Sequence, residues 1–265
     1  MLLPAQFIQS IQQIKGFNQE TFEAVHALEE LVTSIRINEA KVSNNQFPVA
    51  NQVIQNLEPV KWCNSGYYLA ERPSFTFDPA FHAGAYYVQE ASSMFLWQAM
   101  QQIFGNNTAQ KVLDVCAAPG GKSSLLSSFF TDGLVVSNEV IKSRAAVLVE
   151  NLTKWGTVNT IVTNNDPKDF TSLKGFFDAI VIDAPCSGSG MFRKDAAAAD
   201  EWSLNNVALC SQRQQRIIAD VYDALNEDGV LIYSTCSYSQ EEDEDIADWI
   251  VETFGATSIQ LQLQK

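Results

Sequence analysis

The chain has 265 residues, of which 46% are hydrophobic and 18% charged, and its formal net charge is -14. A chain of this length and composition can bury a sizeable core, which excludes disorder as the default and fits one large domain or a catalytic domain with a small companion. No apolar run approaches the roughly 20 residues that span a bilayer, and residues 1–7 lack the pattern of a signal peptide. We therefore expect a cytoplasmic protein with no membrane partner.

Cysteine usage and charge narrow the possible partners. The chain has 5 cysteines and 2 histidines, and no cysteines form a C-x-x-C pair, so we expect neither a metal site nor a disulfide framework. The negative net charge counts against a strong nucleic-acid surface, because phosphate binding requires lysine and arginine. The acidic segment 241–245 contributes to this charge, and we interpret it as the solvated start of a helix, whose dipole it complements.

The first part of the chain is mixed in character. Apolar stripes predict helices within residues 1–32, and a short alternating segment predicts a strand at Ser34–Asn38. The elements expected next are a helix over Ala50–Leu57, strands at Val60–Trp62 and Gly66–Leu69, and a helix over Glu90–Phe104. These elements predict a small α+β region over residues 1–80, separate from the remainder at 81–265.

From Lys111 onward the pattern becomes a regular alternation of strands and helices. Apolar runs predict strands at Val112–Val115, Leu134–Ser137, Thr160–Thr163, Ala179–Ile182 and Val230–Tyr233. Helical periodicity predicts helices at Lys122–Phe130, Ile141–Lys154, Asn205–Leu225 and Glu242–Phe254. This alternation indicates an α/β fold with a doubly wound, mostly parallel sheet, which binds ligands at the carboxyl ends of its strands. We expect one more strand at Ala256–Leu263, and its isolated position at the sheet edge favours a fragment of a longer protein.

The first motif follows the first of these strands. It is a turn of small residues that leads into a helix: Cys116, Ala117, Ala118, Pro119, Gly120 and Gly121. Such a turn lets a ligand approach the backbone beside a helix N-terminus, and it matches neither the dinucleotide nor the P-loop pattern. Lys122 could neutralise a ligand carboxylate such as that of methionine. The alternatives are an ordinary strand-to-helix turn and, for Cys116, a small packing residue.

Acidic residues follow the next two strands. Glu139 comes roughly 20 residues after the glycine turn, where a carboxylate binds ribose hydroxyls. Asp166 could accept a hydrogen bond from an adenine amino group, and Arg144 could reach the same pocket. The alternatives are a helix-start carboxylate for Glu139, an Asn-Asn-Asp-Pro turn for Asp166 and a surface charge for Arg144.

Two thiols follow the last two strands of the alternation. Asp183 and Cys186 lie in a loop rich in proline and glycine, and Cys236 follows Tyr233-Ser234-Thr235. Packing explains such settings poorly, which favours a reactive site. By contrast, Cys63 and Cys210 have no such surroundings, and we interpret them as structural.

These motifs, in this order, resemble a known family. Asp-Val-Cys-Ala-Ala-Pro-Gly-Gly-Lys at 114–122, Asp-Ala-Pro-Cys-Ser-Gly at 183–188 and Tyr-Ser-Thr-Cys-Ser at 233–237 are similar to those of the Sun-type (Nol/Nop/Sun) RNA 5-methylcytosine methyltransferases. Residues 3–7, 34–38 and 82–94 look like the N-terminal part of its bacterial 16S rRNA members of the F type. The similarity thus covers most of the chain.

The resemblance implies a Rossmann-like class I methyltransferase core behind a small RNA-recognition-like region. It implies that Cys116–Lys122, Glu139, Asp166 and Asp183 contact S-adenosylmethionine. It also assigns three catalytic roles. Cys236 would attack the cytosine ring, Asp183 would hold or protonate its nitrogen 3, and Cys186 would assist the final elimination. The family's final edge strand and the further RNA-binding domain of many members are not found in this chain.

The function expected from this resemblance is methylation of carbon 5 of a cytosine in RNA by a monomeric enzyme. The RNA partner expected is 16S rRNA or the small ribosomal subunit, with tRNA as the alternative. An amino-group methyltransferase would explain the Asp-Ala-Pro-Cys loop but would leave Cys236 without a role. A ribose methyltransferase or a non-catalytic ribosome-assembly module would not need either thiol.

Overall fold

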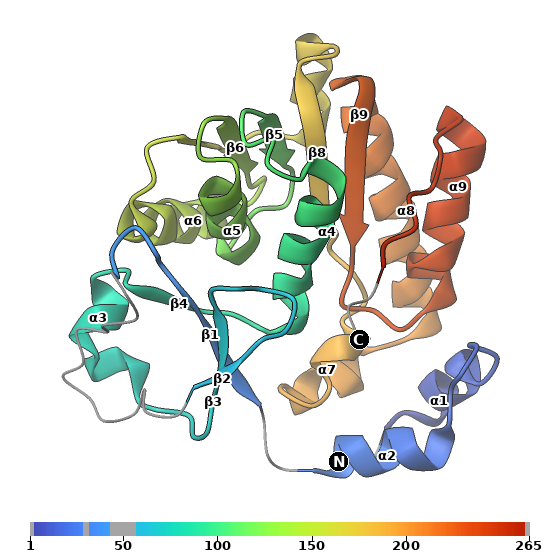
Figure 1. Cartoon of the computed structure of the whole chain (residues 1–265). Coiled ribbons are helices and arrows are strands. Elements are labelled where there is room, and N and C mark those ends of the chain that lie inside the picture. Colours follow the sequence, from blue (N-terminus) through green and yellow to red (C-terminus); the bar gives the residue numbers. More distant parts are fainter. Residues whose placement is uncertain (1–2, 29–31, 43–56, 263–265) are drawn as a thin grey trace.

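A computed structural model describes residues 3–28, 32–42 and 57–262 (Figure 1). Its N-terminal helices are α1 (Ala5–Ile11) and α2 (Gln19–Ala27), and the Asn18 side chain caps α2 by accepting a hydrogen bond from the Thr21 amide. Phe7, Ile8 and Ile11 form a core cluster with Phe192 and Trp202. These helices therefore lie next to α7 (Ala196–Glu201), on the larger part of the molecule.

The smaller sheet contains β1 (Thr33–Ile37), β2 (Glu58–Pro59), β3 (Gly66–Leu69) and β4 (Tyr86–Val88) in the order β2-β3-β1-β4, with antiparallel pairs. This confirms the strands expected at 34–38 and 66–69. The strand expected at 60–62 is wrong. These residues form a turn in which the Cys63 amide donates to the Val60 carbonyl, because the chain reverses there to pair β2 with β3. Of the helix expected over 50–57, residues 50–56 lie outside the described residues.

The division expected at residues 80 and 81 stays a prediction, although β4 joins the smaller sheet from beyond that point. Between the strands lie the 3-10 turn η2 (Phe75–Phe77) and α3 (Pro79–His82). Arg36 of β1 is buried, and its guanidinium stacks 4.3 Å from the Trp155 ring and donates to the Ser124 hydroxyl. This burial lowers the pKa of Arg36 to about 10. The arginine therefore ties the smaller sheet to the rest of the molecule.

The larger sheet contains β5 (Lys111–Asp114), β6 (Leu134–Asn138), β7 (Thr160–Thr163), β8 (Phe177–Asp183) and β9 (Leu225–Ser234). All of its pairs are parallel, in the order β7-β6-β5-β8-β9. The predicted α/β fold and its strands are confirmed. The strand order reverses between β5 and β8. The carboxyl ends of these two strands are therefore the topological switch point, where such folds bind ligands.

Helices cover both faces of this sheet. The helix expected over 90–104 begins later, as the turn η3 (Ser92–Met94) and α4 (Phe95–Phe104). It packs with α5 (Gly121–Phe129) against Val112, whereas α8 (Leu204–Tyr222) and α9 (Glu244–Phe254) pack with Leu113 on the opposite face. The remaining elements are α6 (Lys142–Trp155), η4 (Pro167–Leu173), η5 (Ser189–Met191) and η6 (Gln240–Glu242). The helices predicted from periodicity are thus confirmed with small shifts at their ends.

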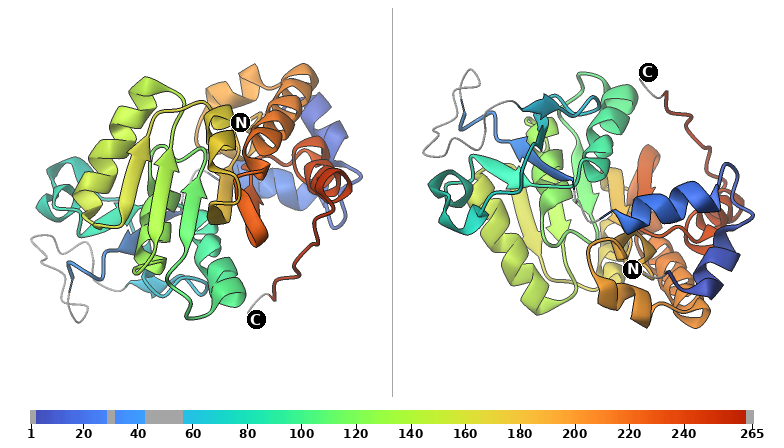
Figure 2. Two further views of the ribbon diagram at one scale, coloured as in Figure 1. Left: turned by 90° about the horizontal axis from the view of Figure 1, so that it is seen from above. Right: turned by 90° about the horizontal axis from the view of Figure 1, so that it is seen from below.

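The last strand expected, over 256–263, is wrong for residues 256–262, which form no strand. Figure 2 shows this segment leaving α9 as an extended tail. The Gln262 amide donates to the Gln102 side chain, and its carbonyl accepts from Gln98 and Gln102. The backbone of Gln262 is therefore bonded to α4 and forms no strand beside β9. Among the described residues, no helix combines the length and apolar character that crossing a membrane requires.

Candidate active site

The loops that carry the two thiols begin side by side at the carboxyl ends of β8 and β9. Asp183 is in register with Ser234, and the Ser234 hydroxyl donates to the Asp183 carboxylate over 3.0 Å. Further along, the Gly190 amide donates to the Cys236 carbonyl over 2.7 Å. A side chain at Gly190 would overlap that carbonyl. Glycine is therefore required where the two loops touch.

The thiols of Cys186 and Cys236 meet between these loops, with 3.2 Å between their sulfur atoms. Both cysteines are free, Cys236 is exposed and Cys186 is partly buried. The hydrogen bond from Cys186 lowers the pKa of Cys236, and the same bond, together with burial, raises the pKa of Cys186. Since the thiolate is the nucleophilic form of cysteine, the greater exposure and the lowered pKa of Cys236 favour this residue as the nucleophile.

Asp183 also connects the thiol loops to the small-residue turn. Its carboxylate lies 2.8 Å from the ammonium group of Lys122, the second residue of α5. A cavity of about 530 Å³ is lined by Lys122, Asp183 and Cys236, with Tyr238 and Phe95 among its other walls. The predicted nucleophile and carboxylate therefore face one open space.

A second, smaller cavity of about 170 Å³ lies along the small-residue turn. Its lining consists of Cys116, Ala117, Ala118, Pro119, Gly121, Lys122 and Asp183, together with residues 87–90 and Ser93. Gly120 has a φ of 112°, which suits glycine alone, and a side chain at Gly121 would press against the Tyr87 ring. Burial raises the pKa of Cys116 to about 12, in keeping with a packing residue. Lys122 and Asp183 line both cavities and so lie at their border.

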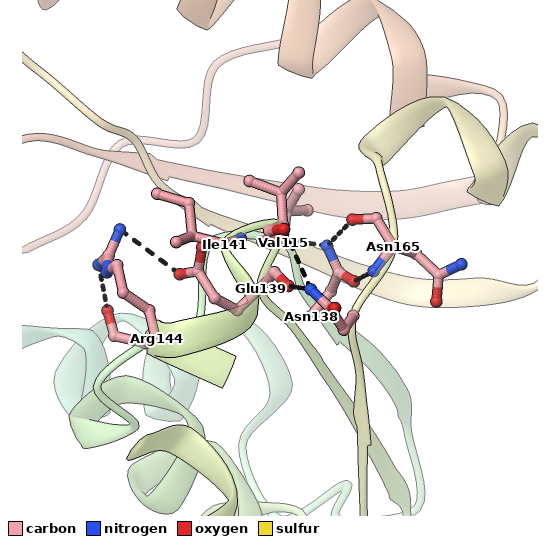
Figure 3. Close-up of polar contacts among 9 residues, drawn as sticks. Val115, Asn138, Glu139, Ile141, Arg144 and Asn165 are labelled. Carbon is pink, nitrogen blue, oxygen red and sulfur yellow. Dashed lines mark hydrogen bonds and ion pairs between the residues drawn. The ribbon is translucent and has the colours of Figure 1, made fainter. Parts of the chain in front are cut away.

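The polar residues expected to bind a nucleoside lie beyond this turn, and Figure 3 shows two of them, Glu139 and Arg144. The Glu139 carboxylate is buried; one oxygen accepts from the Ile141 amide, and the other lies 3.5 Å from Arg144 without a hydrogen bond from the described residues. Arg144 also donates to the Ala118 carbonyl, so it joins Glu139 to the turn. A ribose hydroxyl could donate to this second oxygen, which fits the binding role expected from the sequence.

Asn138 bonds to the ends of neighbouring strands, whereas Asp166 has local partners. The Asn138 amide donates to the Val115 and Asn165 carbonyls and accepts from the Asn165 amide, so it joins the ends of three strands (Figure 3). Asp166 accepts from the Lys168 amide and caps η4. Neither Glu139 nor Asp166 lines the two cavities described above. Their contact with a cofactor remains a prediction.

The interpretation of 241–245 as a solvated helix start is wrong for Glu242. This residue has no exposed surface, whereas Glu241, Glu244 and Asp245 are exposed. The 3-10 turn η6 directs the Glu242 carboxylate inward, where Ser187 and Ser237 donate to it. The serine that follows each of the two cysteines was the signal in the sequence that could have indicated a buried acceptor.

The architecture and the turn at its switch point are those of the Rossmann-like methyltransferases. A methyltransferase homologue from Pyrococcus horikoshii superimposes with a TM-score of 0.69 and 26% identity over 94% of this chain and 83% of that one. NSun6 from the same organism, solved with SFG, gives a TM-score of 0.77 at 18% identity over 94% and 87% of the two chains.

The chain belongs to the 16S rRNA methyltransferase RsmB/F family, whose model matches residues 102–263. The model for the N-terminal domain of 16S rRNA methyltransferase RsmF matches residues 3–91. Ribosomal RNA small subunit methyltransferase F from Pectobacterium atrosepticum is 35% identical over 95% of this chain and 53% of that protein, and its counterpart from Psychromonas ingrahamii is 37% identical over 95% and 54%. The resemblance expected from the motifs is thus confirmed, and the chain spans about half the length of these relatives.

Proposed function

We propose that this chain transfers a methyl group from S-adenosylmethionine to carbon 5 of a cytosine in RNA, with Cys236 as the covalent nucleophile. The observation that carries this proposal is the pair of thiols 3.2 Å apart, of which the exposed one lines a cavity together with Asp183 and Lys122. Methyl transfer to an amino group or a ribose requires no thiol, so those reactions leave this pair unexplained.

Attack by Cys236 would make carbon 5 of cytosine reactive enough to accept a methyl group. Carbon 5 of cytosine is a weak nucleophile, and addition of a thiolate to carbon 6 forms a sulfur–carbon bond and moves electron density onto carbon 5. This is covalent catalysis, which divides one difficult step into easier ones. Asp183 would hold or protonate nitrogen 3 of the ring, where negative charge develops. The carboxyl group must carry a proton when the base is bound in order to donate it, and its contacts with Lys122 and Ser234 hold the side chain in place.

The last step removes the proton from carbon 5. The electron pair of the broken carbon–hydrogen bond restores the ring double bond and expels the Cys236 thiolate. Cys186 is the candidate to assist this step as a base, directly or through a water molecule that takes up the proton. The hydrogen bond to Cys236 is the largest cause of the raised pKa of Cys186, and it is lost when Cys236 is bonded to carbon 6, which makes the Cys186 thiol easier to deprotonate in the adduct.

The cofactor, when bound, supplies the methyl group as an electrophile. On this proposal the turn Cys116–Lys122 approaches it closely, and Glu139 binds its ribose hydroxyls beside Arg144. Asp166 would accept from the adenine amino group, and Asp183 would lie near the reacting centre. The Glu139 oxygen that accepts no hydrogen bond from the described residues and the glycines of the turn support this arrangement.

The proposed substrate is 16S rRNA or the small ribosomal subunit, because the family model and the relatives carry those names. The target base must leave its stack to reach a buried pocket. A tRNA substrate remains the alternative, and the monomeric state and cytoplasmic location remain predictions.

Trapping of the adduct tests the proposal. With unmodified 16S rRNA and S-adenosylmethionine, Cys186→Ala should accumulate a denaturation-resistant protein–RNA adduct, because elimination is blocked. Cys236→Ala should form no adduct and be inactive, and Cys210→Ala, which removes a buried thiol outside the site, should behave as the wild type. An adduct with Cys236→Ala would reverse the two roles. No adduct from either variant, with RNA binding confirmed by filter retention, would favour amino or ribose chemistry.

A further inference from the structure

Glu242 is a buried carboxylate at the back of the two thiol loops. It has no exposed surface and ends the turn η6, immediately before α9. One carboxylate oxygen accepts from the Ser187 amide over 2.8 Å and from Gln214 over 3.1 Å. The other accepts from the hydroxyls of Ser187, over 2.5 Å, and Ser237, over 2.6 Å. Both thiol loops and α8 therefore converge on one side chain.

The donors sit directly beside the reacting groups. Ser187 follows Cys186 and Ser237 follows Cys236, so each bond to Glu242 fixes the backbone next to one thiol. The Gln214 amide extends the same network, because it also donates to the Pro185 carbonyl over 3.1 Å. Glu242 thus joins Ser187 and Ser237, which are 50 residues apart in the chain.

The position of Glu242 is itself fixed. Its carbonyl accepts from the Tyr233 hydroxyl over 2.6 Å, and its amide donates to the Ser239 carbonyl over 3.0 Å. A carboxylate is also the group that this pocket requires. It only accepts hydrogen bonds, and the neighbouring groups that contact it all donate. Burying such a charge is costly unless it is fully satisfied, so this arrangement is explained poorly by packing alone.

We propose that Glu242 is a positioning residue that sets the separation of the Cys186 and Cys236 thiols. It holds the loops together on one side, and the contact between Gly190 and the Cys236 carbonyl holds them on another. The hydrogen bond between the thiols depends on this spacing, because a hydrogen bond weakens steeply with distance and angle. We call the hydrogen bonds of Glu242 to both thiol loops the Glu242 clamp. Its role in catalysis rests on the proposed function, whereas its effect on the distance between the thiols does not.

The experiment compares Glu242→Gln with Glu241→Gln, which changes the exposed neighbour in the same way. Glutamine retains the shape but turns an amide N–H₂ group toward donors. The first readout is the rate at which iodoacetamide alkylates Cys236, resolved by peptide mass spectrometry across a range of pH. In Glu242→Gln the profile should move to higher pH, with a lower rate at pH 7 than in Glu241→Gln.

The second readout is methyl transfer. A displacement of catalytic groups by about 1 Å can cost on the order of 100-fold in rate. We expect a fall in kcat of that order in Glu242→Gln, with KM for S-adenosylmethionine unchanged, and no change in Glu241→Gln. Glu242→Asp, which retains the acceptor on a shorter side chain, should restore part of the kcat and part of the alkylation profile. Thermal unfolding shows whether each variant is folded.

If Glu242→Gln does not fold, Ser187→Ala and Ser237→Ala remove one donor at a time and should each give a smaller shift in the same direction. A folded Glu242→Gln protein with the alkylation profile and kcat of Glu241→Gln would overturn the proposal. A lower kcat with an unmoved thiol profile would also overturn it, since the role would then be structural only. If the wild type transfers no methyl group but the thiol profile still moves, the proposed function fails and the clamp stands.

Discussion

The two halves of the ligand-binding edge are built differently. At the ends of β8 and β9, side chains from both loops meet around Glu242, and the exposed thiol of Cys236 faces an open cavity. At the ends of β5 and β6, the Glu139 carboxylate is buried beneath its own loop and paired with Arg144. The chemical half, which carries the thiols, is therefore held by hydrogen bonds between its two loops, whereas in the nucleoside half, which is proposed to bind the nucleoside, the Glu139 carboxylate is buried.

The two halves differ because their polar side chains have different hydrogen-bond and ion-pair partners. The polar groups of the thiol loops have hydrogen-bond partners in segments about fifty residues away in the chain. The nucleoside half satisfies its carboxylate with a neighbouring amide and a half-exposed arginine. Asp183 and Lys122 form the ion pair that joins the halves. Substitutions in each half should accordingly separate effects on reaction rate from effects on cofactor affinity.

Asp183→Asn should give the largest effect, because it removes the charge shared by both halves. Loss of a group that stabilises developing charge costs about 10²- to 10³-fold in kcat. We expect a loss of that size in methyl transfer to RNA, with Asp200→Asn, on the exposed surface of α7, as the matched control. Equal kcat values for the two variants would remove Asp183 from the reaction.

Gly190→Ala should affect the chemical half alone. The added carbon would overlap the Cys236 carbonyl, so the loops must separate, and a loss on the order of 100-fold in kcat follows from the displaced thiol. The control is Gly188→Ala, where φ is 82° and no atom lies within 4 Å of the added carbon. That change should cost about 1–2 kcal/mol of stability and leave kcat near that of the wild type. Equal effects on kcat would mean that the contact between the loops is unimportant.

Glu139→Gln should affect the nucleoside half alone. A hydrogen bond to a charged group contributes about 1.5–3 kcal/mol, so binding of S-adenosylmethionine should weaken roughly 10- to 100-fold while the alkylation profile of Cys236 stays unchanged. Isothermal calorimetry measures the affinity, and Glu150→Gln on the exposed side of α6 is the control. Unaltered affinity would exclude Glu139 as a ribose ligand.

The pH dependence of Cys236 alkylation should give the smallest of these effects. Because the bond from Cys186 lowers the pKa of Cys236, the thiolate forms at lower pH than in an ordinary cysteine, and alkylation rises at lower pH. Cys186→Ala removes the donor, so the pKa should rise, the curve should move to higher pH and the rate at pH 7 should fall. A curve that stays in place or moves to lower pH would contradict the assigned direction of the hydrogen bond.

Local signals in the sequence predicted most of the fold and the positions of the candidate residues. The strands from Val112 to Tyr233 are short apolar runs, and each motif begins where a strand ends, so parallel pairing brings Asp183, Cys186 and Cys236 to one edge. The turn Cys116–Lys122 was recognisable because packing alone does not require so many small residues between a strand and a helix.

What the sequence did not reveal depends on contacts between distant segments. Glu242 lies in a run of acidic residues, and only the inward orientation of η6 distinguishes it from its exposed neighbours. The tail at 256–262 has a strand-like composition, but the side chains of Gln98 and Gln102 on α4 donate hydrogen bonds to its Gln262 carbonyl. The burial of Glu242 and the conformation of the tail both depend on which hydrogen-bonding groups the fold places next to them.

The most direct test of the central claim uses RNA in which 5-fluorocytosine replaces cytosine. Fluorine at carbon 5 cannot be removed as a proton, so elimination stops after methyl transfer and the sulfur–carbon bond persists. The wild-type protein with S-adenosylmethionine should yield a methylated adduct that peptide mass spectrometry locates at Cys236. An adduct at Cys186, or methylated RNA without any bond to sulfur, would contradict the account.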